Sequence, residues 1–239
     1  MIRHLIALAV LAATAGTFFA ANPPRGAEKK ASAAAQLPES ELNALAAATA
    51  AYGWINLLRD PALTEWQRVS LPPETPLDAR NPWRYDRDTG VLHCDGTGLH
   101  EMLLERTERG DGIFYVEWRY AGAPAKPNSG IFVRTKPDNS IWHRADLAPK
   151  NLGMLSGAKT GLNGKTGRFN SGRRRPELLK KGDEWNVTEL VCVGSRVMLH
   201  VNGVITAEMA ESAATKGFVG LEADGAPLEF RALKFKPIP

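Results

Sequence analysis

Charged side chains alternate with apolar ones along four segments that are rich in β-branched and aromatic residues. Successive side chains of a strand point to opposite faces, so residues two apart share a face. The residues that share a face in this way are Glu117 with Arg119, Phe132 with Arg134, Trp142 with Arg144 and Asp146, and Glu222 with Asp224, whereas His143 has the opposite parity to Arg144. Carboxylates, guanidinium groups and a Trp ring can bind sugar hydroxyls and stack on a sugar ring. The pattern therefore favours a sugar-binding sheet face. A strand with one solvated face shows the same alternation of polar and apolar residues without binding a ligand.

The elements that carry these residues are short strands separated by turn residues. The predicted strands are 91–94, 112–120, 131–135, 141–147, 185–193, 196–204, 218–223 and 228–235. Asn202-Gly203 is the dipeptide typical of a two-residue type I′ hairpin turn. No helical pattern of comparable strength follows Tyr52. Short strands at this spacing predict an all-β antiparallel sandwich or barrel.

The longest predicted connection runs from Gly153 to Gly172 and is rich in Gly, Ser, Asn, Lys and Arg. From Lys159 to Arg175 it carries six basic residues and no acidic one. Long loops often act as lids, and this one could form a cationic rim for an anionic ligand. A solvated loop is the alternative, and we favour it because charge in an exposed loop costs little.

The N-terminus has the features of a secretory signal peptide, which we assign to residues 1–21. Arg3 and His4 precede an uncharged apolar run from Leu5 to Ala20. That run is shorter than the roughly 20 apolar residues of a membrane-spanning helix. We therefore expect export to the periplasm or the extracellular space and no stable membrane insertion beyond the signal segment. An uncleaved N-terminal anchor is the alternative.

The rest of the 239-residue chain divides into a linker and one domain. Residues 22–51 are rich in Ala, Pro, Lys and Ser, and Glu41 to Ala51 could form a short helix in this linker. The β-sandwich domain is expected over residues 52–239. The net charge of +4 comes without a helix, finger or RNP-like motif, so nucleic acid is not an expected partner.

Two cysteines, Cys94 and Cys192, lack the spacing of a metal site. Export allows a disulfide between them, and two buried thiols are equally compatible with their strand-like surroundings. No acidic loop with ligand spacing marks a metal site either, so no cofactor is expected, and a divalent metal is the alternative that the sequence leaves open.

The segment Asn128–Arg134 reads NSGIFVR and resembles the NSG-(I/V)-F-x-R signature of the 3-keto-disaccharide hydrolase family. Further segments resemble that family in the same order: 57–60 with Trp66, 182–186, 199–203, 220–225 and 228–231. The resemblance covers about residues 52–239. It implies an exported concanavalin A-like jelly-roll sandwich of two antiparallel sheets, with a concave face that binds carbohydrate. Its members are described as hydrolases of 3-keto-glycosides, so the expected partner is an oligosaccharide or keto-disaccharide.

The resemblance also places Glu117, Arg134, Asp146 and Glu222 on polar positions of the family, and we expect these four to converge in one hollow. Glu222 or Asp146 would then be a general base, and Arg134 would stabilise an enolate oxygen. The residues expected to bind substrate are Glu117, Trp142, Arg144, His143, Asn128 and Asp224.

Two other functions fit a sandwich fold, because fold alone does not determine function. A non-catalytic, lectin-like carbohydrate-binding module would use the same face, and Ala148, where the family often has Gln, favours this reading. A laminarinase-like glycosidase needs two carboxylates in a motif such as Glu-x-Asp-x-x-Glu, which this chain lacks.

Overall fold

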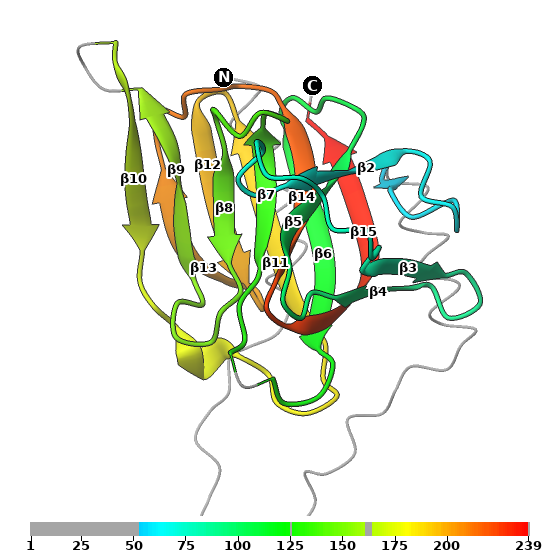
Figure 1. Cartoon of the computed structure of the whole chain (residues 1–239). Coiled ribbons are helices and arrows are strands. Elements are labelled where there is room, and N and C mark those ends of the chain that lie inside the picture. The colour runs from blue at the N-terminus through cyan, green and yellow to red at the C-terminus, as the bar shows by residue number, and fades with distance from the viewer. Residues whose placement is uncertain (1–52, 125, 161–163, 239) are drawn as a thin grey trace, which may run out of the picture. The chain divides into compact units, whose positions relative to one another are not determined.

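Two antiparallel sheets pack face to face in the described part of the chain (Figure 1). A computed structural model describes residues 53–124, 126–160 and 164–238. These residues belong to one compact unit, Thr49–Pro239. The expected signal segment 1–21 and the linker 22–51 with its short helix lie outside the described residues. Within them, no helix has the length and apolar character needed to cross a membrane.

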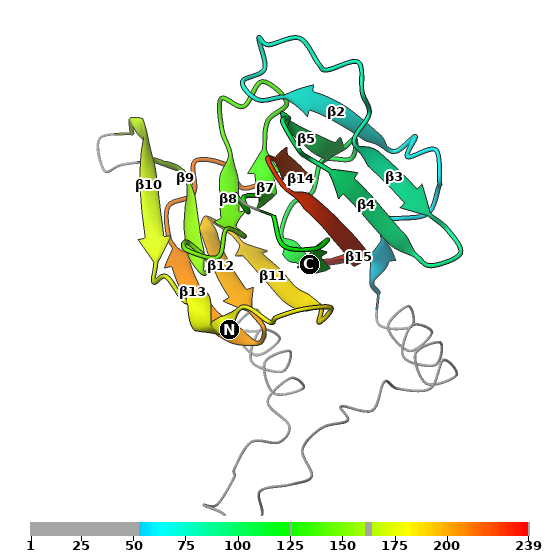
Figure 2. The same ribbon diagram turned by 60° about the horizontal axis from the view of Figure 1, so that its bottom comes forward.

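The eight-stranded sheet has the order β13 (Val204–Met209), β12 (Arg196–Val201), β11 (Asn186–Val193), β6 (Gly112–Tyr120), β15 (Pro227–Pro237), β4 (Val91–Asp95) and β3 (Trp83–Asp86), with β1 (Ile55–Asn56) paired to β15. The seven-stranded sheet has the order β10 (Thr166–Gly172), β9 (Met154–Thr160), β8 (His143–Asp146), β7 (Gly130–Thr135), β14 (Phe218–Asp224), β5 (His100–Glu105) and β2 (Trp66–Ser70). A single 3₁₀ turn, η1 (Pro176–Leu178), interrupts the strands among the described residues. The central strands pair with strands distant in sequence, as Figure 2 shows for β14 between β5 and β7. The all-β concanavalin A-like jelly-roll prediction is confirmed.

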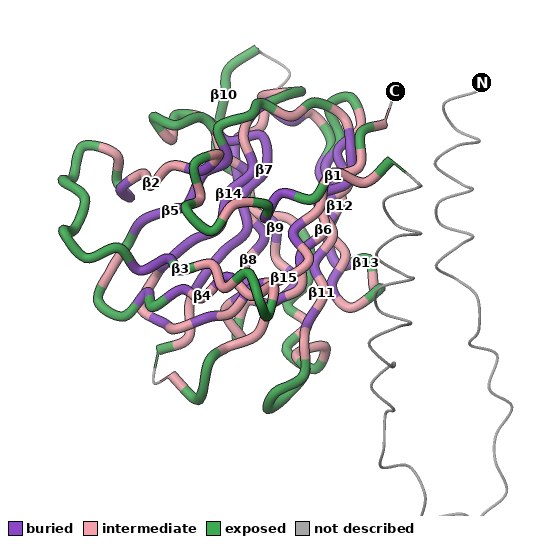
Figure 3. Tube along the Cα trace, turned by 90° about the vertical axis from the view of Figure 1, so that its right-hand side faces the viewer, coloured by how far each residue is buried: buried purple, intermediate pink, exposed green. Residues whose placement is uncertain are grey.

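The core lies between the two sheets and is built by the two-residue repeat. On β6, Phe114, Val116 and Trp118 are almost fully buried, and β14 contributes Val219 and Leu221. The alternate side chains, such as Glu117 on β6 and Glu222 on β14, point to the outer face of their own sheet. Figure 3 shows this burial along the middle of the strands, with exposed loops around them.

The Asn202-Gly203 turn confirms its prediction, since both residues have positive φ, 49° and 81°. Cys94 and Cys192 are both free and buried. Burial raises the pKa of each thiol. The question left open by the sequence is thus answered in favour of two thiols.

The prediction of a loop from Gly153 to Gly172 is wrong, because its described residues form the paired antiparallel strands β9 and β10 at the edge of the seven-stranded sheet. Its pairing depends on backbone hydrogen bonds, which small polar residues can make. Leu155 and Phe169 pack against the core, and this anchors one face of the hairpin. Strands β1, β2, β3 and β5 and most of β13 also lie outside the predicted strands.

Candidate functional site

Six polar side chains gather on the outer face of the seven-stranded sheet, and we call them the polar cluster: His100, Asn128, Arg144, Asp146, Glu222 and Asp224. Glu222 lies in β14 between Leu221 and Ala223, which both point into the core. Strand alternation therefore directs the Glu222 carboxylate outward. It remains 4 % exposed, so its charge depends on the neighbouring side chains.

Arg144 on β8 is the central cation of the polar cluster. Its Nε donates to Glu222 Oε2 at 2.7 Å, and its Nη1 lies 3.1 Å from Asp146 Oδ2. Its Nη2 donates to the Ser129 carbonyl at 2.8 Å and to Asn128 Oδ1 at 3.2 Å. Burial lowers the pKa of Arg144, but the two carboxylates more than offset this, so its pKa is raised. All three nitrogens are engaged, and the guanidinium is held in one orientation.

The residues before β7 support this arrangement. The Asn128 side chain accepts from Arg144 and donates through Nδ2 to the Asp224 carboxylate. The Ser129 hydroxyl donates to the Glu222 carbonyl at 2.7 Å and is buried. Asn128 thus links the arginine to a second carboxylate, and Ser129 ties the loop to the strand that carries Glu222.

Gly130 completes the Asn-Ser-Gly motif because a side chain has no room there. A Cβ on Gly130 would lie 2.2 Å from Arg144 Nε and 2.8 Å from Glu222 Oε2. The space occupied by this ion pair therefore requires glycine. The motif is explained by the polar cluster rather than by backbone conformation.

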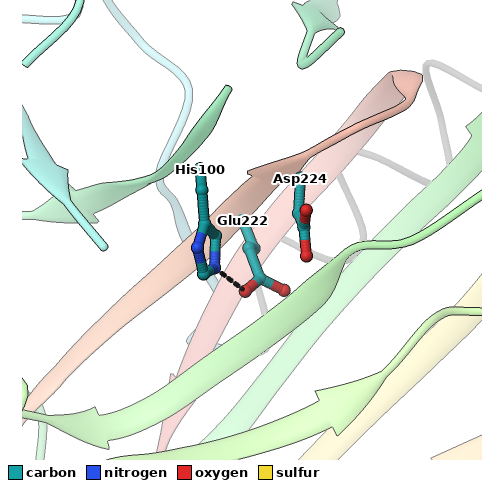
Figure 4. A group of neighbouring side chains, drawn as sticks. All are labelled: His100, Glu222 and Asp224. Atoms are coloured by element: carbon teal, nitrogen blue, oxygen red, sulfur yellow. Dashed lines mark hydrogen bonds and ion pairs between the residues drawn. The ribbon is translucent and has the colours of Figure 1, made fainter. Parts of the chain in front are cut away.

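His100, at the start of β5, is the member of the polar cluster that was not predicted from the sequence, and it contacts Glu222. Its Nε2 lies 3.3 Å from Glu222 Oε1 (Figure 4), and its side chain is 50 % exposed. The hydrogen bond to Glu222 raises the pKa of His100, although partial burial opposes this. Burial alone would raise the pKa of Glu222, but Arg144 and His100 lower it. Glu222 is therefore ionised and orients an accessible imidazole.

Asp224 lies beside this pair, as Figure 4 shows. One ligand atom from each of His100, Glu222 and Asp224 lies within 4.8 Å of the other two. Such a set of one imidazole and two carboxylates can bind a divalent cation. Without one, the accessible imidazole beside a carboxylate can transfer a proton.

Trp142 lies on the same outer face, where its sequence parity places it, but it packs in a neighbouring apolar cluster. Its ring meets Phe132 edge to face, with centroids 6.4 Å apart. The guanidinium of Arg168 on β10 lies 5.8 Å from the Trp142 centroid. Trp142 is thus a fixed ring adjoining the polar residues.

Arg134 does not join the polar cluster, which corrects its predicted place in a common hollow. An extra residue in β7 relative to β14 forms a bulge, and Arg134 has a φ of 49°. The side chain is 1 % exposed and its Nη2 contacts Asp111 Oδ1 at 3.0 Å. The bulge redirects Arg134 away from Arg144.

His143 lies on the inner side of β8, in agreement with its parity. It is fully buried, and its Nε2 donates to the Ala158 carbonyl at 2.7 Å. Burial lowers the pKa of His143. A neutral imidazole buried on this side is not placed to contact a ligand of the polar cluster.

Glu117 belongs to the other sheet, so its predicted convergence with Asp146 and Glu222 is also wrong. It lies on the outer face of the eight-stranded sheet, where Tyr115 donates to it at 2.8 Å and Arg231 Nε at 2.7 Å. Strand parity correctly gave an outward side chain, but it does not tell which sheet the strand joins.

Several solved structures share this fold. Two candidate glycosyl hydrolases from Parabacteroides distasonis match with TM-scores of 0.55 and 0.57, at 19 % and 14 % identity, covering 77 % and 80 % of this chain and 99 % and 96 % of theirs. A carbohydrate-binding module from Bacillus subtilis matches with a TM-score of 0.51 at 13 % identity, over 71 % of this chain and 94 % of that one. At these identities the matches show a shared fold. Among curated proteins, no sequence relative was found.

The comparison with protein families covers almost the whole described region. The model of the 3-keto-α-glucoside-1,2-lyase-like domain matches residues 53–236. This range includes every member of the polar cluster and supports a carbohydrate-related role. The chain therefore belongs to the family of 3-keto-α-glucoside-1,2-lyase-like domains.

Proposed function

We propose that the chain cleaves 3-keto-glycosides at the polar cluster, outside the cytoplasm. The observation that carries this proposal is the contact between the half-exposed His100 and the buried, ionised Glu222. Membership in the family supports the substrate class. The alternation of charged residues that the sequence predicts on β8 and β14 provides the surrounding groups.

Cleavage of a 3-keto-glycoside needs two things from the protein: a group that transfers a proton, and a positive charge. A ketone at C3 acidifies the C2 proton of the sugar. A base removes this proton, the C1–O bond breaks, a C1–C2 double bond forms, and the leaving oxygen receives a proton. Water then adds across the double bond, so the sum is hydrolysis. The positive charge stabilises the C3 oxygen while it carries negative charge.

His100 replaces Glu222 and Asp146 as our choice for the base. Asp146 is engaged by Arg144 and by the backbone N–H of Ala148, and Glu222 is almost inaccessible with a lowered pKa. The contact with Glu222 holds a proton on His100 Nε2 and leaves Nδ1 to accept the C2 proton. Glu222 then stabilises the imidazolium, which can return a proton to the leaving oxygen.

Arg144 replaces Arg134 as the cation that stabilises the C3 oxygen, because Arg134 points away from the cluster. The electrostatic effect of a fixed guanidinium is largest where water is excluded. Arg144 is 15 % exposed at its side chain, which satisfies this condition in part.

Turnover of 3-keto-trehalose or a 3-keto-glucoside tests the assignment. We expect His100→Gln to lower kcat/KM about 10²- to 10⁴-fold, the usual contribution of a general acid–base group. Glu222→Gln should also lower it, whereas Glu117→Gln on the other sheet should leave it unchanged. A parallel assay with a chelator, followed by added Mg²⁺, Ca²⁺ or Mn²⁺, tests whether His100, Glu222 and Asp224 hold a cation. Equal rates for wild type and His100→Gln would contradict the proposal.

A non-catalytic carbohydrate-binding module is the second candidate. It is favoured by the extensive bonding of Arg144, Glu222 and Asp146 to one another, which leaves few groups for catalysis. Calorimetric titration with keto- and non-keto-disaccharides separates the two. Tight binding of both, without turnover of either, would favour the binding module.

Export is supported by the apolar N-terminal segment 1–21. N-terminal sequencing of the mature protein after cell fractionation tests it. A cleaved protein in the periplasm or medium is expected, and an intact N-terminus in the membrane fraction would indicate an anchor instead.

A further inference from the structure

A second, apolar cluster lies next to the polar cluster on the same outer face. Its buried members are Leu71, Met102, Leu104 and Phe132, and its partly buried members are Val69, Trp142 and Phe218. These side chains lie apart from the core between the sheets, since Ile131 and Leu103, their neighbours along the strands, belong to that core. The outer face therefore has a polar half and an apolar half.

The two halves are in direct register. Glu222 pairs with Met102 across β14 and β5, and Arg144 pairs with Phe132 across β8 and β7. Side chains of directly paired residues are neighbours, with Cβ atoms about 5 Å apart. Trp142 lies directly before β8 and two residues before Arg144, a spacing of about 7 Å in extended chain. A ligand seated on the polar half can thus extend onto Trp142 without a gap.

Trp142 is held as a rigid surface. Phe132 contacts it edge to face at 6.4 Å, and the Arg168 guanidinium lies 5.8 Å from its centroid. Both contacts restrict the indole and leave it partly exposed. An aromatic ring held in this way can stack on another flat apolar group at little entropic cost.

The residues of the apolar half also indicate which chemical group of a substrate could bind there. A second sugar would bring hydroxyls that lose water and need hydrogen-bond partners. The seven members of the apolar cluster offer almost none, since the indole N–H of Trp142 is their single side-chain hydrogen-bond donor. A flat apolar group needs no such partners and gains from burial.

We infer that the partly exposed ring of Trp142, backed by the buried members of the apolar cluster, binds the leaving group of the substrate, and that this group is an aromatic aglycone. The inference rests on the proposed function, because it places the sugar on the polar half. The reaction is unchanged: His100 takes the C2 proton, the bond from C1 to the phenolic oxygen breaks, and the phenol leaves with the returned proton. Water then adds to the sugar product.

The test compares phenyl and methyl 3-keto-glucosides as substrates of the full chain. Trp142→Ala should lower the ratio of the phenyl to the methyl kcat/KM about tenfold, which corresponds to burial of part of one ring. The ratio is the readout, because phenol is intrinsically the better leaving group. Trp185→Ala, which removes an aromatic ring directly before β11 of the other sheet, should leave the ratio unchanged. Trp142→Phe should restore most of it and would show that the loss does not come from misfolding.

A matched binding experiment keeps the inference separate from the proposed function. Unoxidised phenyl and methyl glucosides are titrated by calorimetry against wild type, Trp142→Ala and Trp185→Ala. Wild type and Trp185→Ala should bind the phenyl glucoside more tightly than the methyl glucoside, and Trp142→Ala should not. This result supports the aromatic subsite even if no keto-sugar is cleaved. An unchanged ratio in Trp142→Ala, in turnover or in binding, overturns the inference. Turnover with an unchanged ratio would leave the proposed function intact and remove the aromatic aglycone.

Discussion

The outer faces of the two sheets carry similar ion pairs that differ in burial. On the seven-stranded sheet, the side chains of Arg144 and Glu222 are 15 % and 5 % exposed. On the eight-stranded sheet, the side chains of Arg231 and Glu117 are 42 % and 20 % exposed, at the same 2.7 Å distance. The distance alone therefore does not distinguish a candidate site from a solvated face.

The partners of the two arginines differ as well. Arg144 is fixed by two carboxylates, a side-chain amide and a backbone carbonyl. Arg231 has one carboxylate and lies 4.2 Å from the Trp185 centroid, which Arg119 also approaches at 4.4 Å. A stacked, exposed arginine can move with its tryptophan, whereas a buried network holds its members in place. The comparison suggests that only the buried network can orient a reacting group such as His100.

The largest expected effect comes from removing the arginine of each pair. Arg144→Leu should lower the free energy of unfolding by about 3–5 kcal/mol, because it removes the main counter-charge of two largely buried carboxylates, Asp146 and Glu222. Arg231→Leu should lower it by about 1 kcal/mol, the value for an exposed pair with a cation–π contact. Urea unfolding of both variants measures the difference. Equal losses would show that burial does not separate the two faces.

A smaller effect is expected from filling the space beside the buried pair. Gly130→Ala places a Cβ 2.2 Å from Arg144 Nε, so it should cost about 1–3 kcal/mol through overpacking and lower activity. Gly167→Ala is the matched control, since nothing lies within 4 Å of its Cβ and its φ is not positive. Its stability should change by less than about 1 kcal/mol. A tolerated Gly130→Ala would mean that the pair can move aside.

Local sequence patterns predicted the outward direction of the site residues but not their grouping. Alternation placed Arg144 with Asp146 and made Glu222 outward-facing, because the two-residue repeat is a property of one strand. Glu117 follows the same repeat on β6, which joins the other sheet. The sheet that a strand joins is decided by packing between distant segments, and no local pattern records it.

Other features depend on tertiary contacts in the same way. The bulge that turns Arg134 is visible only in the register of β7 against β14. His100 precedes the apolar run Met102–Leu104, which is consistent with a buried strand, but its contact with Glu222 requires the pairing of β5 with β14. The hairpin at Gly153–Gly172 lacks strand-forming composition and is held by its place at the sheet edge.

The smallest expected effects are opposite pH dependences of stability on the two faces. The contact with Glu222 raises the pKa of His100 above its ordinary 6.5, with Asp224 also favouring the protonated form and burial and Arg144 opposing it. The folded protein then holds this proton more tightly than the unfolded chain does. The resulting stabilisation is complete below pH 6.5 and is lost as the pH rises through the raised pKa. His100→Gln should therefore reduce stability more at pH 5.5 than at pH 9, by less than about 1 kcal/mol.

His200, on the outer face of the eight-stranded sheet, is the matched control. Burial lowers its pKa below 6.5, and its Nδ1 lies 3.9 Å from Glu189, beyond hydrogen-bond distance. The unfolded chain therefore takes up this proton first, so wild type loses stability as the pH falls below 6.5. His200→Gln should remove that loss, so the stability of this variant relative to wild type should increase at low pH. Thermal unfolding of both variants from pH 5 to 9 measures the two slopes. Slopes of the same sign would show that Glu222 does not stabilise the protonated form of His100, and His100 would then lack the partner that its proposed role requires.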